Sequence, residues 1–87
     1  MANQPLTQGT AIVLVADDNA SLRSKIIDFL TLEGIRSVEA SDGRMALNEA
    51  LRVQPSVVLL DIKMPALDGL TAAKLMVELP WRPEVIL

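Results

Sequence analysis

The sequence predicts an α/β fold, in which a parallel sheet is covered by helices on both faces. Four short runs rich in apolar or β-branched residues are typical of strands, and helical apolar spacing fills each gap between them. Strands that alternate with helices are joined by right-handed crossovers, so neighbouring strands are expected to be parallel. We therefore expect one domain over 10–87, after a flexible leader over 1–9. The predicted strands are 10–16, 35–40, 56–60 and 84–87.

The first strand and helix are predicted from a change in apolar spacing. The strand, 10–16, is rich in β-branched residues, and Asn19 or Ser21 is suited to cap the helix that follows. Gly34 is expected to end this helix, because glycine favours the backbone conformation found after helix C-termini. One apolar face of the helix is formed by Leu22, Ile26, Phe29 and Leu30, with Arg23 pointing elsewhere.

The second strand, 35–40, is the most polar of the four, which suits the edge of a sheet, with Val38 facing inward. A turn at Ser41-Asp42-Gly43 begins the second helix, which ends at Gln54-Pro55. We expect a buried face on this helix, with Met45 also in the core. The face consists of Ala46, Leu47, Ala50 and Leu51.

The third strand runs through four consecutive apolar residues into Asp61, a pattern that predicts a strand buried on both faces. A loop containing Pro65 follows, with Asp68 as helix cap and Gly69 allowing a tight approach. The third helix is expected to end at Leu79-Pro80, before a turn around Trp81. Its apolar face consists of Leu70, Ala73, Met76 and Val77.

Composition excludes several kinds of function. Hydrophobic residues make up 51% of the chain and aromatic residues only 2%, so the core must be aliphatic. The net charge is −3 and the basic residues do not cluster, which argues against direct binding of nucleic acid. Without cysteine or histidine, the chain has no disulfide, thiolate or histidine metal site, histidine triad or histidine phosphoacceptor. Its apolar runs are too short for a bilayer, and we expect a cytoplasmic protein without membrane contact.

Acidic side chains follow two of the predicted strands, at the point where each strand ends. Asp17 and Asp18 follow the first strand, and Asp61 follows the third. If these strands are neighbours, their carboxyl ends meet at one edge of the sheet, where open α/β sheets place their binding sites. Three gathered carboxylates repel one another, and a hard cation such as Mg²⁺ would relieve that repulsion. A carboxylate beside such a cation can attack phosphorus.

Simpler interpretations exist for each acidic residue alone. Asp17 or Asp18 could cap the first helix, and Asp61 could be a turn residue at the start of a loop. The Lys63 side chain is better explained as solvated than as catalytic. The combination of both strand ends favours a functional site over these separate interpretations.

Four segments resemble one known family. They are A-I-V-L-V-A-D-D-N at 11–19, A-S-D-G-R-M-A-L at 40–47, V-V-L-L-D-I-K-M-P-A-L-D-G-L at 57–70 and P-E-V-I-L at 83–87. On these residues the sequence resembles the receiver domain of bacterial two-component response regulators, the CheY-like domains. The resemblance implies a flavodoxin-like, doubly wound sheet with strand order 2-1-3-4. It also implies a signalling module that is not itself an enzyme.

The resemblance also implies roles for particular residues. Asp61 matches the phosphoacceptor nucleophile, and Asp17 and Asp18 match the acidic pair that holds Mg²⁺, Asp18 directly and Asp17 largely through water. Lys63 matches the position whose backbone carbonyl is a further metal ligand. A sensor histidine kinase or a phosphotransfer protein would supply the phosphoryl group.

The family's fourth helix, fifth strand and fifth helix have no counterpart in this sequence, which ends at Leu87. The switch Ser or Thr and the Lys that pairs with the phosphoryl group belong to that missing part. We therefore expect impaired phosphorylation, an exposed apolar edge at 85–87 and self-association. Two alternatives stay open: a non-catalytic receiver-like interaction or dimerisation domain and, with less support, a Mg²⁺-dependent phosphatase. That class requires a second Asp where Lys63 stands.

Overall fold

The computed structural model describes residues 11–64 and 69–87, so the predicted leader and the predicted roles of Pro65 and Asp68 lie outside the described residues. Four parallel strands form one sheet in the order β2-β1-β3-β4, as the sequence predicts. This is the flavodoxin-like arrangement, and it makes β1 and β3 neighbours. The strands are β1 (Ile12–Ala16), β2 (Arg36–Ala40), β3 (Val57–Leu60) and β4 (Glu84–Ile86).

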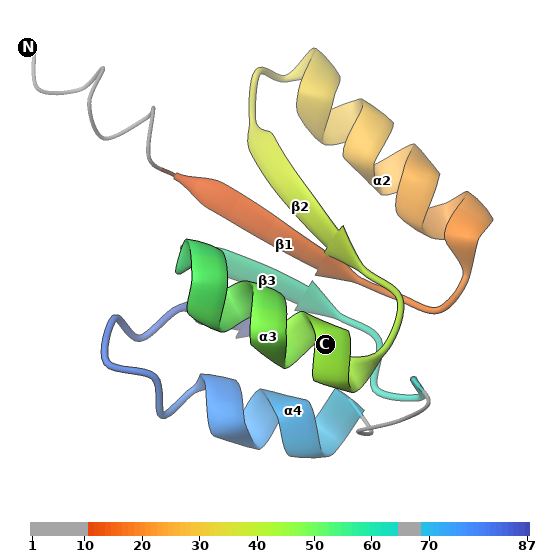
Figure 1. The fold of residues 1–87 in the computed structure, drawn as a ribbon. Helices are drawn as coiled ribbons and strands as arrows, with labels where there is room; N and C mark the ends of the chain where they lie inside the picture. Colours follow the sequence, from red (N-terminus) through yellow and green to blue (C-terminus); the bar gives the residue numbers. More distant parts are fainter. Residues whose placement is uncertain (1–10, 65–68) are drawn as a thin grey trace, which may run out of the picture.

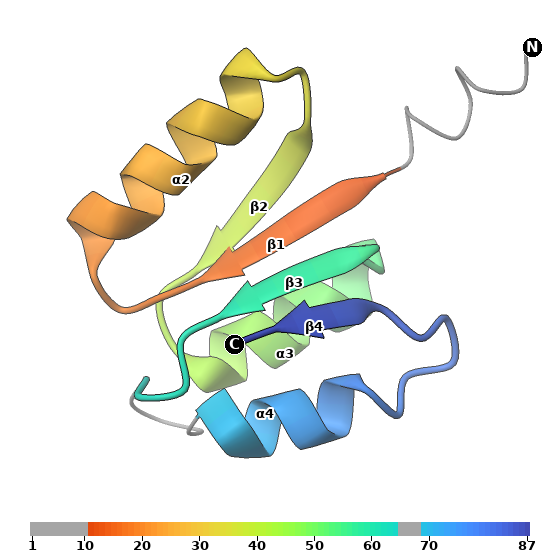
Figure 2. The same ribbon diagram turned by 180° about the vertical axis from the view of Figure 1, so that it is seen from behind.

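Three helices pack on the two faces of this sheet. Figure 1 shows α3 (Gly43–Val53) and α4 (Gly69–Met76) on one face, and α2 (Ala20–Leu32) lies on the other. Figure 2 shows the sheet from behind. On this side the only described helix is α2, which lies next to β2, and no described helix lies in front of β3 or β4. No helix within 11–64 or 69–87 is long and apolar enough to cross a membrane.

The N-cap residues fix where the first two helices begin. Asn19, one of the two predicted caps, accepts a hydrogen bond from the Leu22 backbone N–H at 3.0 Å, so α2 begins at Ala20. Asp42 does the same for α3, accepting from the Met45 N–H at 2.8 Å. Gly34 follows α2 with a φ of 75°, a left-handed conformation that glycine adopts without strain.

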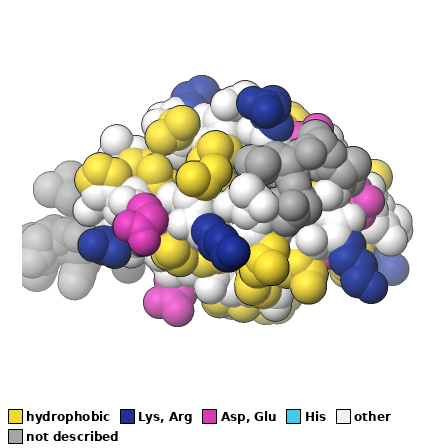
Figure 3. Space-filling view, turned by 90° about the horizontal axis from the view of Figure 1, so that it is seen from below, with side chains coloured by type: hydrophobic (Ala, Val, Ile, Leu, Met, Phe, Trp, Pro, Cys, Tyr) yellow, Lys and Arg dark blue, Asp and Glu magenta, His cyan; other side chains and the backbone are white. Residues whose placement is uncertain are grey.

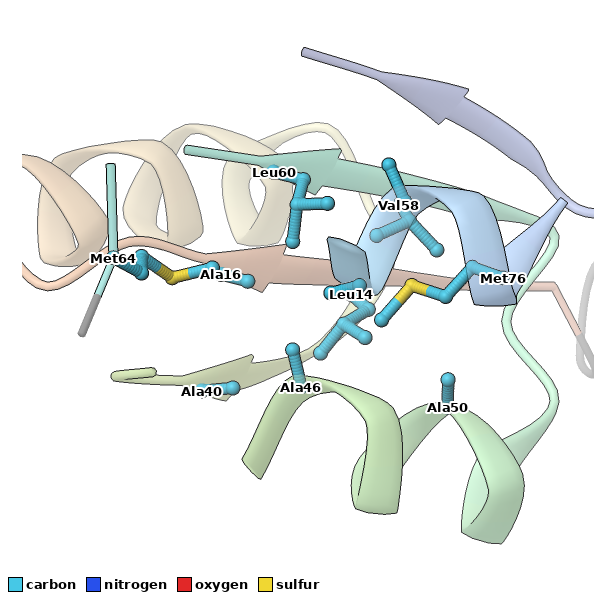
Figure 4. Packing of buried hydrophobic residues seen from close by; sticks show 11 residues of the cluster. Leu14, Ala16, Ala40, Ala46, Ala50, Val58, Leu60, Met64 and Met76 are labelled. Atoms are coloured by element: carbon cyan, nitrogen blue, oxygen red, sulfur yellow. The ribbon is translucent and has the colours of Figure 1, made fainter. Parts of the chain in front are cut away.

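The hydrophobic core lies between the sheet and the pair α3 and α4, a region that we call the closed face. Figure 4 shows side chains of β1 and β3 pointing at small residues of α3 and at Met76 of α4. Small alanines let the helix backbone approach the sheet closely. The residues labelled in that view are Leu14, Ala16, Ala40, Ala46, Ala50, Val58, Leu60, Met64 and Met76.

The opposite side, which we call the open face, is only partly covered. Val15 of β1 is buried there, but Val57 and Leu59 of β3 are partly exposed. The expectation that β3 is buried on both faces is therefore wrong for one face. The reason is that α2 packs against β2 and β1 and, in Figure 2, lies on the β2 side of the sheet, away from β3 and β4.

The apolar stripe predicted on α2 exists but is mostly exposed. Leu30 is buried and Ile26 partly buried, whereas Phe29 is 60% exposed and Leu22 is also exposed. The helix turns Leu30 toward the sheet, which leaves Leu22 and Phe29 of the stripe at the surface.

The predicted buried faces of α3 and α4 are partly wrong. In α3, Leu51 is 54% exposed and Met45 is 42% exposed. Leu70 of α4 is exposed, and so is Val77, which lies just after the helix ends at Met76. Each helix is rotated so that small residues and Met76 face the sheet, which brings the backbones close and leaves the larger side chains at the rim. Figure 3, viewed from the side on which α4 lies, shows apolar side chains at the surface between charged ones. The buried residues of α4 are Gly69, Ala72, Ala73 and Met76.

The connection from α4 to β4 is fastened to the end of α3. The α4 helix ends at Met76, before the predicted Leu79, and turns follow. Trp81 donates a hydrogen bond from its indole Nε1 to the Pro55 carbonyl at 2.9 Å. The Glu84 N–H then donates to the Ser56 carbonyl at 2.9 Å, which starts the pairing of β4 with β3.

Candidate functional site

Asp17 is held at the end of β1 by backbone hydrogen bonds. Its N–H donates to the Ala40 carbonyl at the end of β2, at 3.1 Å. Its side-chain Oδ1 accepts from the Asn19 N–H at 2.8 Å, which closes a tight turn before α2. These bonds fix both the backbone and the direction of the carboxylate.

Asp61 occupies the matching place at the end of β3. Its N–H donates to the Ala16 carbonyl at 2.9 Å, and its Oδ1 accepts from the Lys63 N–H at 3.0 Å. The first residue of α4 lies directly against it, because a Cβ at Gly69 would overlap the Asp61 carbonyl oxygen. Glycine is therefore required at residue 69 by this close approach, as the sequence predicts.

The two strand ends bring three carboxylates together. One carboxylate oxygen from each of Asp17, Asp18 and Asp61 can be chosen so that all three lie within 4.8 Å of one another. Asp18 is exposed and the other two are partly buried, so the cluster is open to solvent. Three hard oxygen donors, without sulfur or imidazole, fit Mg²⁺. The Lys63 backbone carbonyl stays a predicted ligand, since the structure fixes only the N–H of that residue through Asp61.

A pocket of about 280 Å³ adjoins the carboxylate cluster. Asp17 and Asp61 line its polar end, and Ile26 of α2, Leu59 of β3 and Ile86 of β4 line its apolar part. The pocket therefore connects the acidic cluster to the open face.

Arg23 is a residue of this site that the sequence analysis missed. It was expected to point away from the apolar face of its helix, yet its side chain is only 17% exposed and donates to the Asp17 carbonyl. Its position six residues after Asp17, less than two helical turns into α2, was the available signal.

The sequence model of the response regulator receiver domain matches residues 13–87. This chain belongs to that family. It is therefore a receiver domain of the two-component phosphorelay systems, whose members bind Mg²⁺ at an acidic pocket and interact with histidine kinases or phosphotransfer proteins.

One similar protein is the protein-glutamate methylesterase/protein-glutamine glutaminase of Archaeoglobus fulgidus, which is 49% identical over 76 residues. The match covers 86% of this receiver domain chain but only 22% of the length of that relative. The chain thus spans about a fifth of the length of that curated protein.

Two solved structures show the same fold. The receiver domain of AraT from Geobacillus stearothermophilus has a TM-score of 0.79 and 35% identity, over 87% of this chain and 61% of that one. Response regulator TrrA from Thermotoga maritima, solved in complex with Mg²⁺-BeF, has a TM-score of 0.82 and 30% identity. The second match covers 88% of this chain and 67% of TrrA.

Proposed function

We propose that Asp61 accepts a phosphoryl group from a sensor histidine kinase or a phosphotransfer protein. In this proposal Asp17, Asp18 and Asp61, with the backbone carbonyl of Lys63, hold Mg²⁺. The observation that carries it is the meeting of three carboxylates from two neighbouring strand ends within 4.8 Å. The similarity to TrrA, solved with Mg²⁺-BeF, supports the choice of metal.

The chemistry requires an oriented nucleophile and compensation of charge. A carboxylate oxygen of Asp61 forms a bond to phosphorus while the phosphorus–nitrogen bond of a phosphohistidine breaks, and the electron pair leaves on the imidazole nitrogen. These 87 residues contain no histidine, so the donor imidazole lies outside them. The Lys63 N–H holds Oδ1 of Asp61, which orients the whole carboxylate. Bound Mg²⁺ would offset the negative charge on the phosphoryl oxygens.

In this proposal the domain signals from the cytoplasm and is not an enzyme. We also expect the polypeptide of residues 1–87, taken by itself, to be phosphorylated poorly. By resemblance, the Ser or Thr and the Lys that contact the phosphoryl group in receiver domains have no counterpart within these residues.

The proposed role of Asp61 is tested by treating the chain with Mg²⁺ and acetyl phosphate and measuring its intact mass. A phosphate-sized gain in a minor fraction of the molecules is expected in the unaltered chain and in Asp28→Asn, a matched change at an exposed aspartate of α2. The gain should disappear in Asp61→Asn. An equal gain in Asp61→Asn, or no gain at saturating Mg²⁺, would contradict the assignment.

A second candidate function is a non-catalytic interaction or dimerisation domain. The open face favours it, because Phe29 and Leu22 of α2 and Ile86 of β4 are exposed there. Within the described residues the outer edge of β4 has no strand beside it. We expect two copies of the chain to associate through this edge and the apolar residues of the open face, by strand or segment exchange.

Size-exclusion chromatography with light scattering tests self-association. The expected result is a mass that rises with concentration. A folded monomer at high concentration would contradict it. Binding of Mg²⁺ and phosphorylation, measured on the same sample, separate the two candidate functions.

A further inference from the structure

The Arg23 guanidinium joins three elements next to the acidic cluster. It extends from α2, its Nη1 donates to the Asp17 backbone carbonyl at 2.8 Å, and its Nε donates to Glu39 Oε1 of β2 at 2.7 Å. The Arg23 side chain is only 17% exposed and its bond to Asp17 is partly buried, so solvent competes less for this bond than for the exposed bond to Glu39. Hydrogen bonds that involve a charged group are stronger than neutral ones.

The bond to Asp17 acts on the peptide unit that carries Asp18. The Asp17 N–H is already bound to the Ala40 carbonyl. Arg23 binds the carbonyl on the other side of the same residue, and that carbonyl belongs to the peptide group linking Asp17 to Asp18. The plane of this peptide sets where the Asp18 side chain begins, so Arg23 fixes the direction in which Asp18 leaves the backbone.

The pairing with Glu39 changes the electrostatic effect of Arg23. A lone guanidinium beside the cluster would repel a metal cation, whereas one paired with a carboxylate contributes little net charge. Arg23 therefore supplies its hydrogen bond to Asp17 while Glu39 offsets its charge.

We propose that Arg23 is a positioning residue for the metal ligands, with Glu39 as its partner. It does not touch the metal. It holds the Asp17–Asp18 peptide in the orientation that brings both carboxylates toward Asp61. The inference rests on the proposed function of this cluster as a Mg²⁺ site.

The test is the Mg²⁺ affinity of Arg23→Met, measured by isothermal titration calorimetry on the full 87-residue chain. Loss of such an outer contact is expected to weaken Mg²⁺ binding roughly 10- to 100-fold. Lys25→Met, an exposed change on the same helix that removes the same charge, should alter the affinity by no more than about twofold. Arg23→Lys keeps a donor that can reach Asp17 or Glu39 but not both, and should restore part of the affinity.

A second measurement needs no metal. In the NMR spectrum of the metal-free chain, the Asp18 amide should shift in Arg23→Met and stay in place in Lys25→Met. If Arg23→Met does not fold, Arg23→Lys takes over both measurements, with weaker Mg²⁺ binding and a shifted Asp18 amide expected.

Three outcomes would overturn the inference. Unchanged or tighter Mg²⁺ binding in Arg23→Met would show that Arg23 acts only through its charge or not at all. An equal loss of affinity in Lys25→Met would assign the effect to net charge. Absence of Mg²⁺ binding and of phosphorylation in the unaltered chain would overturn the proposed function together with this inference. If only the predicted loss of Mg²⁺ affinity in Arg23→Met is not found, this inference is wrong and the proposed function is unaffected.

Discussion

The two faces of the sheet are built from equally apolar strands but are covered very differently. On the closed face, α3 and α4 lie side by side and bury Leu14 and Val58 completely. On the open face, α2 covers β1 and β2, and β3 and β4 keep exposed apolar atoms. An apolar strand can be buried on both faces, but the neighbouring helices decide how much of its surface is actually covered.

A leucine-to-alanine substitution should destabilise the two faces of the sheet by very different amounts. Leu14→Ala removes a completely buried side chain from the closed face and should lower the free energy of unfolding by about 2–5 kcal/mol. Leu59→Ala, at a partly exposed position of the open face, should cost at most about half as much. Urea denaturation measures both losses of stability, and equal losses would show that the two faces are equally well covered.

Gly69→Ala tests the close contact between the start of α4, on the closed face, and the backbone of Asp61 in the acidic cluster. The added Cβ overlaps the Asp61 backbone, so we expect a loss of about 1–3 kcal/mol and a lower yield of phosphorylation. Gly34→Ala is the control, because open space surrounds that position and only its positive φ makes alanine unfavourable, at about 1 kcal/mol. Phosphorylation should be unchanged in the control. An equal fall in the phosphorylation yield of both variants would show that the contact between Gly69 and Asp61 is not the cause.

Phe29→Gln tests whether the open face takes part in self-association. The side chain is exposed, so the free energy of unfolding should change by no more than about 0.5 kcal/mol. Self-association measured by light scattering should weaken, because the apolar stripe of α2 loses its largest member. Leu51→Gln, at an exposed position of α3, should leave association unchanged. Similar effects of both changes would show that association does not use the open face.

The smallest effect is expected at a solvated ion pair of α3. The hydrogen bond and charge of Arg52, 2.6 Å from Glu49, hold the pKa of Glu49 below its usual value. A carboxyl pKa that is lower in the folded state stabilises the fold above the unfolded-state pKa, and this contribution is lost as the pH falls through the folded-state pKa. Thermal unfolding of the unaltered chain and Glu49→Gln should therefore differ slightly at neutral pH and converge in acid. A difference that widens in acid would contradict this.

Much of the fold could be predicted from the sequence because the strands and the helix caps carry local signals. The short apolar runs, Asn19 and Gly34 each act within a few residues, and the structure confirms them. The rotation of α3 and α4 could not be predicted in this way. Whether Leu51 or Ala50 faces inward depends on how closely a helix backbone approaches the sheet, which is a property of the packed structure.

The meeting of the acidic side chains could also be predicted from local signals, but the hydrogen bond by which Arg23 holds the Asp17 carbonyl could not. Parallel strands place Asp17 and Asp61 at one edge once β1 and β3 are neighbours, which the structure confirms. The contact of Arg23 with the Asp17 carbonyl depends on one side-chain conformation across a turn, which the six-residue spacing between them permits but does not specify. The metal role of the cluster stays a prediction.

The hydrogen bond from Trp81 to the Pro55 carbonyl also gives the molecule an optical reporter. The chain has one tryptophan and no tyrosine, so its near-ultraviolet emission comes almost entirely from this partly buried indole. The indole lies where the segment that leads into β4 is hydrogen-bonded to Pro55, just after the end of α3. Release of β4 during strand exchange would expose the ring to water and shift its emission to longer wavelength, while changes confined to the acidic cluster would leave it unaltered.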